Sequence, residues 1–301
     1  MWSDMAEPLF SLDPPPGTYP YRHTQDDRFQ YRAKVQPAGE CLEFVVRAVD
    51  TRRAAEADYR AWAGIPRGKR TEPESDQDRD DSIRRSTERA RRMVRLLSLE
   101  MGADRLLTFT TRDTYALDTL QVIWDRFCRM ARAFDPSFSY IAVPEPHADK
   151  DHWHIHAAYK GWVNINVVRR MWHAAICSVT GRGKHSDTAG TRSPGNVDVQ
   201  YRGKASGIQK ARRIAGYISK YITKDLIERF NKKRYWHTKG VKVPEAKRKW
   251  LEADNLDEAM REVMASYGLL VDGQFPVCKV WKPGNLVFFW VHSDQLPAPP
   301  F

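Results

Sequence analysis

The sequence predicts an α+β fold in which helices flank a central, mainly antiparallel sheet. Between residues 106 and 201, segments with the two-residue alternation of strands take turns with segments of helical periodicity. One connection, from residue 143 to residue 153, is short enough to be a hairpin. Because the two strands of a hairpin run in opposite directions, the sheet is expected to be mainly antiparallel.

The chain as a whole has the composition of a folded, basic protein. Of its 301 residues, 42% are hydrophobic, which is enough to bury a sizeable core. Lysine and arginine together number 49 against 38 acidic residues, and the resulting net charge of +11 attracts polyanions. Nucleic acid is therefore the first partner to consider, although the charge alone fits a soluble basic protein equally well.

The cysteines and the ends of the chain bear on the cellular compartment. The four cysteines are widely spaced and form no CxxC pair, which argues against a zinc ribbon and against a disulfide scaffold. The first residues lack the basic and apolar segments of a signal peptide, and the apolar run at 286–291 is too short to span a membrane. We therefore expect a cytoplasmic protein with no membrane partner, in a bacterial host cell if a phage or plasmid encodes it.

The N-terminal part of the chain is rich in proline and polar residues, and only residues 41–49 have the pattern of a strand. The acidic residues 71–81 contain no apolar side chain and are typical of a solvated linker. Ser82 is a candidate N-cap for the helix that follows, in which apolar residues recur at helical spacing and arginines cover the other face. This pattern places the first domain boundary after residue 81.

Beyond this boundary the periodicity predicts further strands and helices, with a Gly-rich basic loop at 181–195. The expected strands are 106–111, 139–143, 153–159, 196–201, 275–281 and 286–291, and the expected helices are 117–134, 167–177 and 256–267. The predicted division is an N-terminal region at 1–81, a catalytic domain at 82–226 and a basic C-terminal extension at 227–301. No GxxxxGK[ST] phosphate-binding loop is present in the sequence, so an ATPase motor is not expected in this chain.

Histidines are concentrated before and within the expected strand at 153–159. In a strand, residues two apart point to the same face, so His154 and His156 can bind one ion. If the preceding turn is centred near residues 149 and 150, Glu145 falls opposite His154 on that face. A mixed nitrogen and oxygen set with open positions suits Mg²⁺ or Mn²⁺, with zinc as an alternative.

Two other interpretations of the histidines stay open. A shifted register would make His152 and His154 the pair, so His152 is an alternative ligand. An isolated His-x-His pair also occurs on polar sheet faces that bind no metal. The matching carboxylate of Glu145 favours a metal site with His154 and His156.

The segment 211–226 has isoleucines and a leucine at steps of four, which predicts one apolar stripe on a helix. At about 100° per residue, four polar side chains share an arc of about 100° away from that stripe: Tyr217, Lys220, Tyr221 and Lys224. A phenol has a pKa close to 10 and is a poor nucleophile near neutral pH, so it needs cationic neighbours or a metal-polarised phosphate. An ordinary amphipathic helix would show the same pattern, and the metal motif upstream favours the catalytic interpretation.

Basic residues cluster before and at the start of this helix. The expected DNA-binding residues are Arg182, Lys184, Arg192, Arg202, Lys204, Lys210, Arg212 and Arg213. A second patch contains Lys232, Lys233, Arg234, Tyr235 and Trp236. Basic side chains can follow phosphates and aromatic side chains can stack on unpaired bases. The clustering carries this prediction, since each charge alone is an ordinary surface group.

Three motifs, in the same order along the chain, resemble those of the HUH endonuclease superfamily, and within it the bacteriophage-type replication initiation proteins with paired tyrosines. Residues 106–110 resemble the first motif, His154-Ile-His156 matches the histidine-hydrophobic-histidine motif, and the segment YISKYITK at 217–224 matches the YxxKYxxK helix. The resemblance covers roughly residues 82–226. It implies a five-stranded antiparallel sheet flanked by helices, with the metal and the tyrosine helix meeting over the sheet.

The resemblance also implies roles and an activity. Glu145, His154 and His156 would be the metal ligands, and Tyr217 and Tyr221 the nucleophiles, while the extra His152 departs from the usual pattern. The implied activity is nicking of single-stranded DNA at a replication origin through a 5′-phosphotyrosine, followed by rejoining, in rolling-circle replication. A separate helicase and a host polymerase are the expected partners. A relaxase or transposase with the same chemistry, and a non-catalytic DNA-binding module with a metal, are the alternatives.

Overall fold

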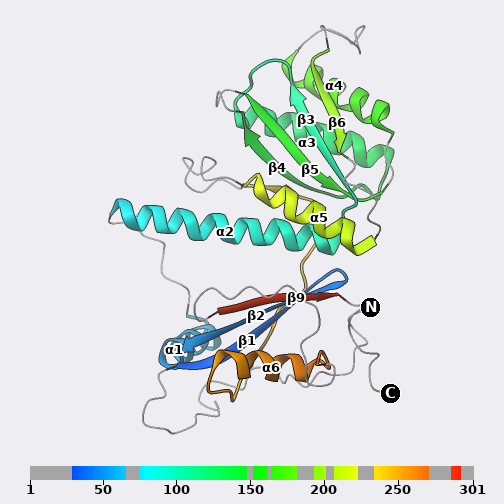
Figure 1. Cartoon of the computed structure of the whole chain (residues 1–301). Coiled ribbons are helices and arrows are strands. Elements are labelled where there is room, and N and C mark those ends of the chain that lie inside the picture. The colour runs from blue at the N-terminus through cyan, green and yellow to red at the C-terminus, as the bar shows by residue number, and fades with distance from the viewer. Residues whose placement is uncertain are drawn as a thin grey trace. The chain divides into compact units, whose positions relative to one another are not determined.

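The computed structural model has the predicted α+β architecture (Figure 1). The residues that it describes are 29–65, 75–147, 152–161, 164–181, 193–200, 207–222, 234–270 and 286–292. The chain divides into two compact units. The larger unit is Pro73–Val243, and the smaller unit combines Met1–Glu72 with Pro244–Phe301. Among the described helices, none is both long enough and apolar enough to cross a bilayer.

A five-stranded antiparallel sheet forms the centre of the larger unit, with the strand order β6-β3-β5-β4-β7. Its strands are β3 (Arg105–Thr111), β4 (Tyr140–Pro146), β5 (Trp153–Tyr159), β6 (Gly195–Gln200) and β7 (Trp236–His237). The hairpin β4–β5 pairs Glu145 with His154, and β3 pairs Thr108 with His156. Because directly paired residues share a face of the sheet, these four side chains lie on the same face.

The opposite face of this sheet is buried by α3 (Leu117–Phe134) and α4 (Ile165–Thr180). Phe109 of β3 is at the centre of this core. Its ring centroid lies 5.1 Å from that of Trp124, 4.9 Å from that of Phe127 and 5.2 Å from that of Trp172. The three contacts are edge-to-face, the geometry that aromatic rings prefer, so this cluster fixes both helices on the sheet.

Truncation of the central ring tests this account of the core. Phe109→Ala is expected to lower the free energy of unfolding by about 3–5 kcal/mol, since it removes a fully buried ring and leaves a cavity. Chemical denaturation followed by circular dichroism measures the change. Phe109→Leu retains more of the buried volume and should cost clearly less. Equal losses for the two variants would contradict a stabilisation that depends on volume.

The face that carries Glu145 and His156 is apolar at one end and polar at the other. At the apolar end, Leu106, Ile141 and Ala158 are buried under α2 (Asp76–Met101) and α5 (Gly207–Lys220). Further along the same strands, the residues of this face are threonine, glutamate and histidine. The two helices therefore cover the apolar end, and α5 ends beside the polar end.

Helix α2 begins within the segment predicted as an acidic linker, so that prediction is wrong for residues 76–81. Ser75 is the N-cap, and its hydroxyl accepts a hydrogen bond from the backbone N–H of Asp78. Asp76 and Asp78 lie in the first turn, where acidic side chains interact favourably with the positive end of the helix dipole. Ser82 is accordingly inside the helix and does not cap it.

The smaller unit has a four-stranded sheet with the order β8-β1-β2-β9. Its elements are β1 (Phe29–Ala38), β2 (Cys41–Asp50), α1 (Thr51–Trp62), β8 (Lys247–Trp250), α6 (Leu256–Ser266) and β9 (Leu286–His292). Strands from both ends of the chain pair here, so the predicted boundaries after residues 81 and 226 differ from the observed division of the chain. Such pairing is non-local and leaves no mark on local periodicity. The predicted strand at 275–281 lies outside the described residues.

Candidate functional site

The candidate site begins with three side chains on the hairpin β4–β5. Glu145 and His154 are directly paired across the hairpin, which is the register that the sequence predicts, and His156 lies two residues further along β5. His156 is buried, with 5% of its surface exposed, whereas His154 and Glu145 are partly exposed. The site is therefore open at the hairpin end and closed below His156.

Both ring nitrogens of His156 have neighbours. Nε2 lies 2.8 Å from Glu145 Oε2, and Nδ1 lies 3.2 Å from the hydroxyl oxygen of Thr108. Burial, and then the nearby His154, lower the pKa of His156 to about 4, so the ring is neutral at neutral pH. Burial raises the pKa of the Glu145 carboxyl, and the positive charge of His147 acts in the opposite direction. A neutral imidazole has one N–H and one lone pair, so in this arrangement Nε2 donates to Glu145 and Nδ1 accepts from Thr108.

The chemistry of these donors fits a divalent ion. Nε2 and Oε2 lie 2.8 Å apart, close to the edge of an octahedron with metal bonds of about 2.1 Å. Loss of the Nε2 proton to a metal would move the ring proton to Nδ1, and the Thr108 hydroxyl can accept as well as donate. The ring centroid of His154 is 6.3 Å from that of His156. Within the described part of the chain, no three His, Cys, Asp or Glu side chains are already gathered as a ligand set.

Thr108 is a positioning residue that the sequence analysis missed, although the pattern Leu-Thr-Phe-Thr of β3 places its hydroxyl on the polar face. Thr108→Val keeps the shape of the side chain and removes the partner of Nδ1. We expect Mn²⁺ to bind this variant about 10–100-fold more weakly, with an unchanged melting temperature. Isothermal titration with Mn²⁺ measures the affinity. An unchanged affinity would show that Thr108 does not orient the imidazole for a metal.

The tyrosines reach the site from the end of α5. The helix ends at Lys220, before the predicted end at residue 226, and residues 223–233 lie outside the described residues. The chain then closes into a tighter turn, in which the backbone N–H of Tyr221 donates to the carbonyl of Ile218. The carbonyl of Ile222 accepts a hydrogen bond from Arg91 Nε of α2 at 2.9 Å. This contact satisfies a carbonyl just beyond the helix end and fixes the terminal turn that carries Tyr221.

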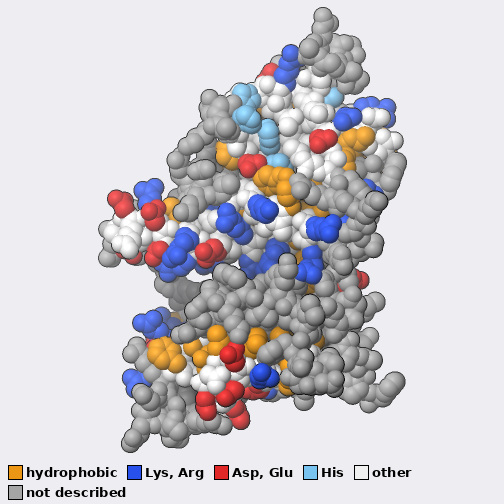
Figure 2. Space-filling model, viewed as in Figure 1, with side chains coloured by type: hydrophobic (Ala, Val, Ile, Leu, Met, Phe, Trp, Pro, Cys, Tyr) orange, Lys and Arg blue, Asp and Glu red, His pale blue; other side chains and the backbone are white. Residues whose placement is uncertain are grey.

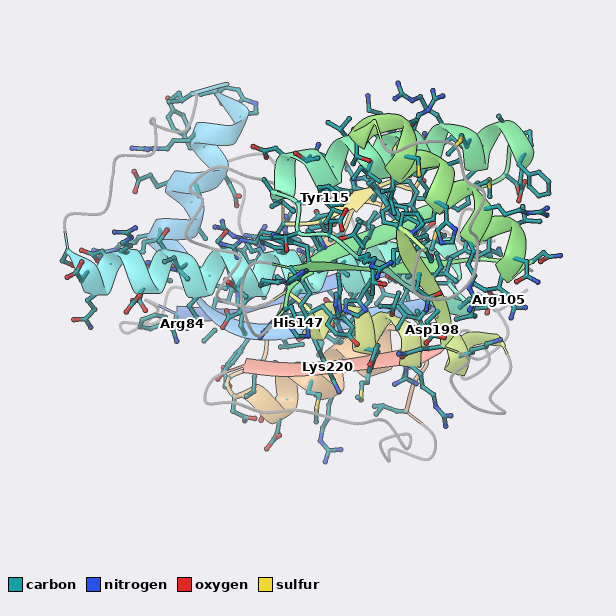
Figure 3. The ribbon with its side chains drawn as sticks, turned by 90° about the horizontal axis from the view of Figure 1, so that it is seen from above. Arg84, Arg105, Tyr115, His147, Asp198 and Lys220 are labelled. Atoms are coloured by element: carbon teal, nitrogen blue, oxygen red, sulfur yellow. The ribbon has the colours of Figure 1, made fainter. Side chains whose placement is uncertain are left out.

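The ring of Tyr221 stacks on the ring of His156, with centroids 3.5 Å apart and planes inclined by 7°. Tyr217 is one turn earlier, and its ring centroid is 5.1 Å from that of Tyr221 in an edge-to-face contact. Lys220 is exposed, and Figure 3 places it on the same side of the sheet as His147 and Asp198. The fold therefore brings both tyrosines and Lys220 to the polar face of the sheet, while Lys224 is outside the described residues.

Two further histidines lie near the pair. His152, the alternative ligand, has its Nε2 2.8 Å from the hydroxyl of Thr114. His147, which the sequence analysis did not select, has its ring centroid 5.3 Å from that of His154. The backbone N–H of His147 donates to the carbonyl of His152, which extends the hairpin by one contact. Figure 2 shows these histidines as one group on the surface.

Few of the predicted DNA-binding residues fall in the described part of the chain. Among them, Arg213 is exposed, Arg212 is half-buried and Lys210 is buried. The others are outside it: Arg182, Lys184, Arg192, Arg202, Lys204, Lys232 and Lys233.

The described part of the second predicted patch does not form a DNA-binding surface. Trp236 belongs to β7 and stacks on Trp124 in the core, with ring centroids 6.3 Å apart. Tyr235 packs against the apolar cluster under α5. Arg234 donates a hydrogen bond to the hydroxyl of Thr87. The pairing of β7 with β4 turns these aromatic side chains inward, and this pairing has no local sequence signal.

The comparisons with known proteins bear on the segment that carries this site. Residues 104–226 match the model of a family of replication-associated proteins of the ORF2 type. No curated protein and no solved structure matches the chain. The matched segment contains Glu145, His154, His156, Tyr217 and Tyr221. It therefore supports a replication initiator family for this protein and a role in the initiation of replication.

Proposed function

We propose that this protein nicks single-stranded origin DNA with a tyrosine, holds the cut strand as a 5′-phosphotyrosine and rejoins the ends, as a rolling-circle replication initiator. The observation that carries the proposal is the contact of Tyr221 with His156, whose Nε2 lies against Glu145. A phenol is thereby held beside the nitrogen and oxygen donors best suited to a metal. The family match of the surrounding segment supports the same interpretation.

The chemistry requires that a phosphate be held between these two groups. A divalent ion, Mg²⁺ or Mn²⁺, bound by Glu145, His154 and His156 would supply Lewis acidity at the scissile phosphate. The phenol oxygen forms a bond to phosphorus as its proton passes to solvent, and the bond from phosphorus to the 3′ oxygen breaks. The 3′ oxygen takes up a proton and leaves as a hydroxyl that a host polymerase can extend. The exposed Lys220 favours the phenolate form and the approach of the phosphate.

The second tyrosine gives the proposal its link to repeated rounds of replication. Tyr217 lies one helical turn from Tyr221, with its ring against that of Tyr221. While one tyrosine holds the DNA end, the other can attack the newly made junction, so that each round ends with a protein still attached to DNA. A separate helicase would unwind the duplex, since the sequence carries no phosphate-binding loop.

Formation of a covalent adduct tests the proposal. The full chain is incubated with labelled single-stranded origin DNA and Mg²⁺, Mn²⁺ or EDTA, and products are separated on a denaturing gel. We expect a protein–DNA adduct with Mg²⁺ or Mn²⁺ and none with EDTA, and mass spectrometry should place the adduct on Tyr217 or Tyr221. Tyr235→Phe, at another tyrosine of the same apolar cluster, is the matched control and should react like the unmodified protein.

Two results would contradict the proposal. Absence of an adduct with every divalent ion, despite DNA binding, would favour a non-catalytic DNA-binding module. An adduct on another residue would show that the face of α5 is not the nucleophilic surface. If the adduct forms only on transfer-origin or transposon-end sequences, the same chemistry serves a relaxase or a transposase.

A further inference from the structure

Helix α2 carries a dense run of arginines that the proposed chemistry does not use. Residues 84–95, RRSTERARRMVR, contain six arginines and one acidic residue, and we call this run the arginine segment. The first turns of the same helix, residues 76–81, have four aspartates and one arginine. The charge of α2 therefore changes sign along its length, and the positive part is the part nearer to α5.

The arginine segment lies beside the tyrosines. Arg91 contacts the carbonyl of Ile222, the residue after Tyr221. Figure 1 shows the N-terminal half of α2 extending past the end of α5, so the segment continues from the tyrosine turn outward. Figure 2 shows Lys and Arg side chains gathered over α2 and α5, next to the histidines. The active face and the arginine segment form one continuous surface of the larger unit.

The arginines of the segment are accessible enough to meet a ligand. Arg85, Arg89 and Arg91 are exposed, and Arg92 and Arg95 are half-buried. Helix α5 adds the exposed Arg213 and Lys220 and has no acidic residue. A surface with this excess of positive charge attracts a polyanion. The polyanion that the proposed function brings to this place is the DNA strand whose phosphate meets the tyrosine.

We propose that the arginine segment of α2 binds the phosphates of the single strand that continues from the tyrosines past the end of α5. This inference rests on the proposed function. The eleven residue steps from Arg84 to Arg95 span about 17 Å of helix, which equals the rise of about five stacked nucleotides. The segment would hold the strand in place by its backbone and would read no sequence, because arginines that contact phosphates fix position alone.

The salt dependence of DNA binding tests the inference without chemistry. Binding of a labelled single-stranded oligonucleotide to the variant Tyr217→Phe/Tyr221→Phe, without divalent ions, is measured by fluorescence anisotropy at several salt concentrations. In that background, Arg89→Gln, Arg92→Gln and Arg95→Gln are combined. Each phosphate contact on a single strand contributes about 0.7 to the slope of log Kd against log salt, so the triple variant should lower the slope by about 2. Arg91 is left unchanged because it also fixes the tyrosine turn.

Matched variants separate a local surface from a general effect of charge. Arg79→Gln removes one positive charge from the exposed acidic part of the same helix and should leave the slope unchanged. Changing Arg89, Arg92 and Arg95 to lysine instead should retain most of the slope. Thermal melting checks that each variant is folded. If the triple glutamine variant melts early, the three single variants are compared instead, and each should lower the slope by about 0.7.

The outcomes distinguish this inference from the proposed function. An unchanged slope in folded glutamine variants, or an equal effect of Arg79→Gln, overturns the binding surface even if the unmodified protein forms an adduct. A reduced slope that is specific to the segment supports the surface. If that reduction is seen while the unmodified protein never forms an adduct, the proposed chemistry is overturned and the binding surface is not.

Discussion

Tyr221→Phe is expected to reduce the first covalent adduct by at least about a hundredfold, whereas Tyr217→Phe should reduce it by no more than about tenfold. The reason is position: the ring of Tyr221 stacks on His156, while Tyr217 reaches the histidine only through Tyr221. Phenylalanine keeps both ring contacts and removes only the hydroxyl that forms the bond to phosphorus. The rate of adduct formation on single-stranded DNA, followed on denaturing gels, measures the difference.

The second reaction step should show the opposite preference. Tyr217→Phe should form the first adduct but fail to cut a second strand while the first is bound, so that strand transfer between two oligonucleotides is lost. The double variant should form no adduct. Equal residual activity in the two single variants would contradict an order set by the stacking of Tyr221, because it would show that either hydroxyl reaches the phosphate equally well.

The parts of the fold that the sequence predicted well are those fixed by local pattern. The helix Leu117–Phe134 and the strand Trp153–Tyr159 have the predicted bounds, because strong periodicity and clear flanking residues determine them. The register of the hairpin also follows from local information. A turn centred between residues 149 and 150 fixes which residues oppose each other, and Glu145 therefore pairs with His154.

The parts that could not be predicted depend on distant contacts. The strand β1 was missed because its inward residues, such as Ala33 and Val35, alternate weakly, and its pairing with β8 joins the two ends of the chain. The strand β7 has two residues and exists only through its pairing with β4. The start of α2 was misplaced because its acidic first turn resembles a solvated linker in composition, and the cap by Ser75 is a single hydrogen bond.

The candidate site shows the same division between local pattern and tertiary contact. The histidine pair, the carboxylate and both tyrosines could be selected from spacing, since two-residue and four-residue steps place them on common faces. The contacts that position them could not. Thr108 and Arg91 act through residues that are 48 and 131 positions away in the chain, and no periodicity records such a contact.

The histidine motif offers the second test with a large expected effect. His156→Ala should lower the rate of adduct formation by about a thousandfold, since a metal ligand contributes several kcal/mol and each 1.36 kcal/mol corresponds to a tenfold change in rate. His154→Ala should also cause a large loss. His152→Ala should cost less than about tenfold, because its imidazole contacts Thr114 and lies outside the contact of His156 with Glu145 and Tyr221. This series decides the register of the metal ligands.

A loss of activity in His156→Ala has two physical sources, because the same ring contacts Glu145 and supports Tyr221. His156→Gln separates them, since an amide retains a hydrogen bond to the carboxylate but is a poor ligand for a metal. Its melting temperature should stay near that of the unmodified protein while its Mn²⁺ affinity and its adduct are both lost. An active His156→Gln with undiminished Mn²⁺ binding, or a His152→Ala as inactive as His156→Ala, would move the ion to another set of ligands. The role of His156 would then be reduced to that of a ring on which Tyr221 packs.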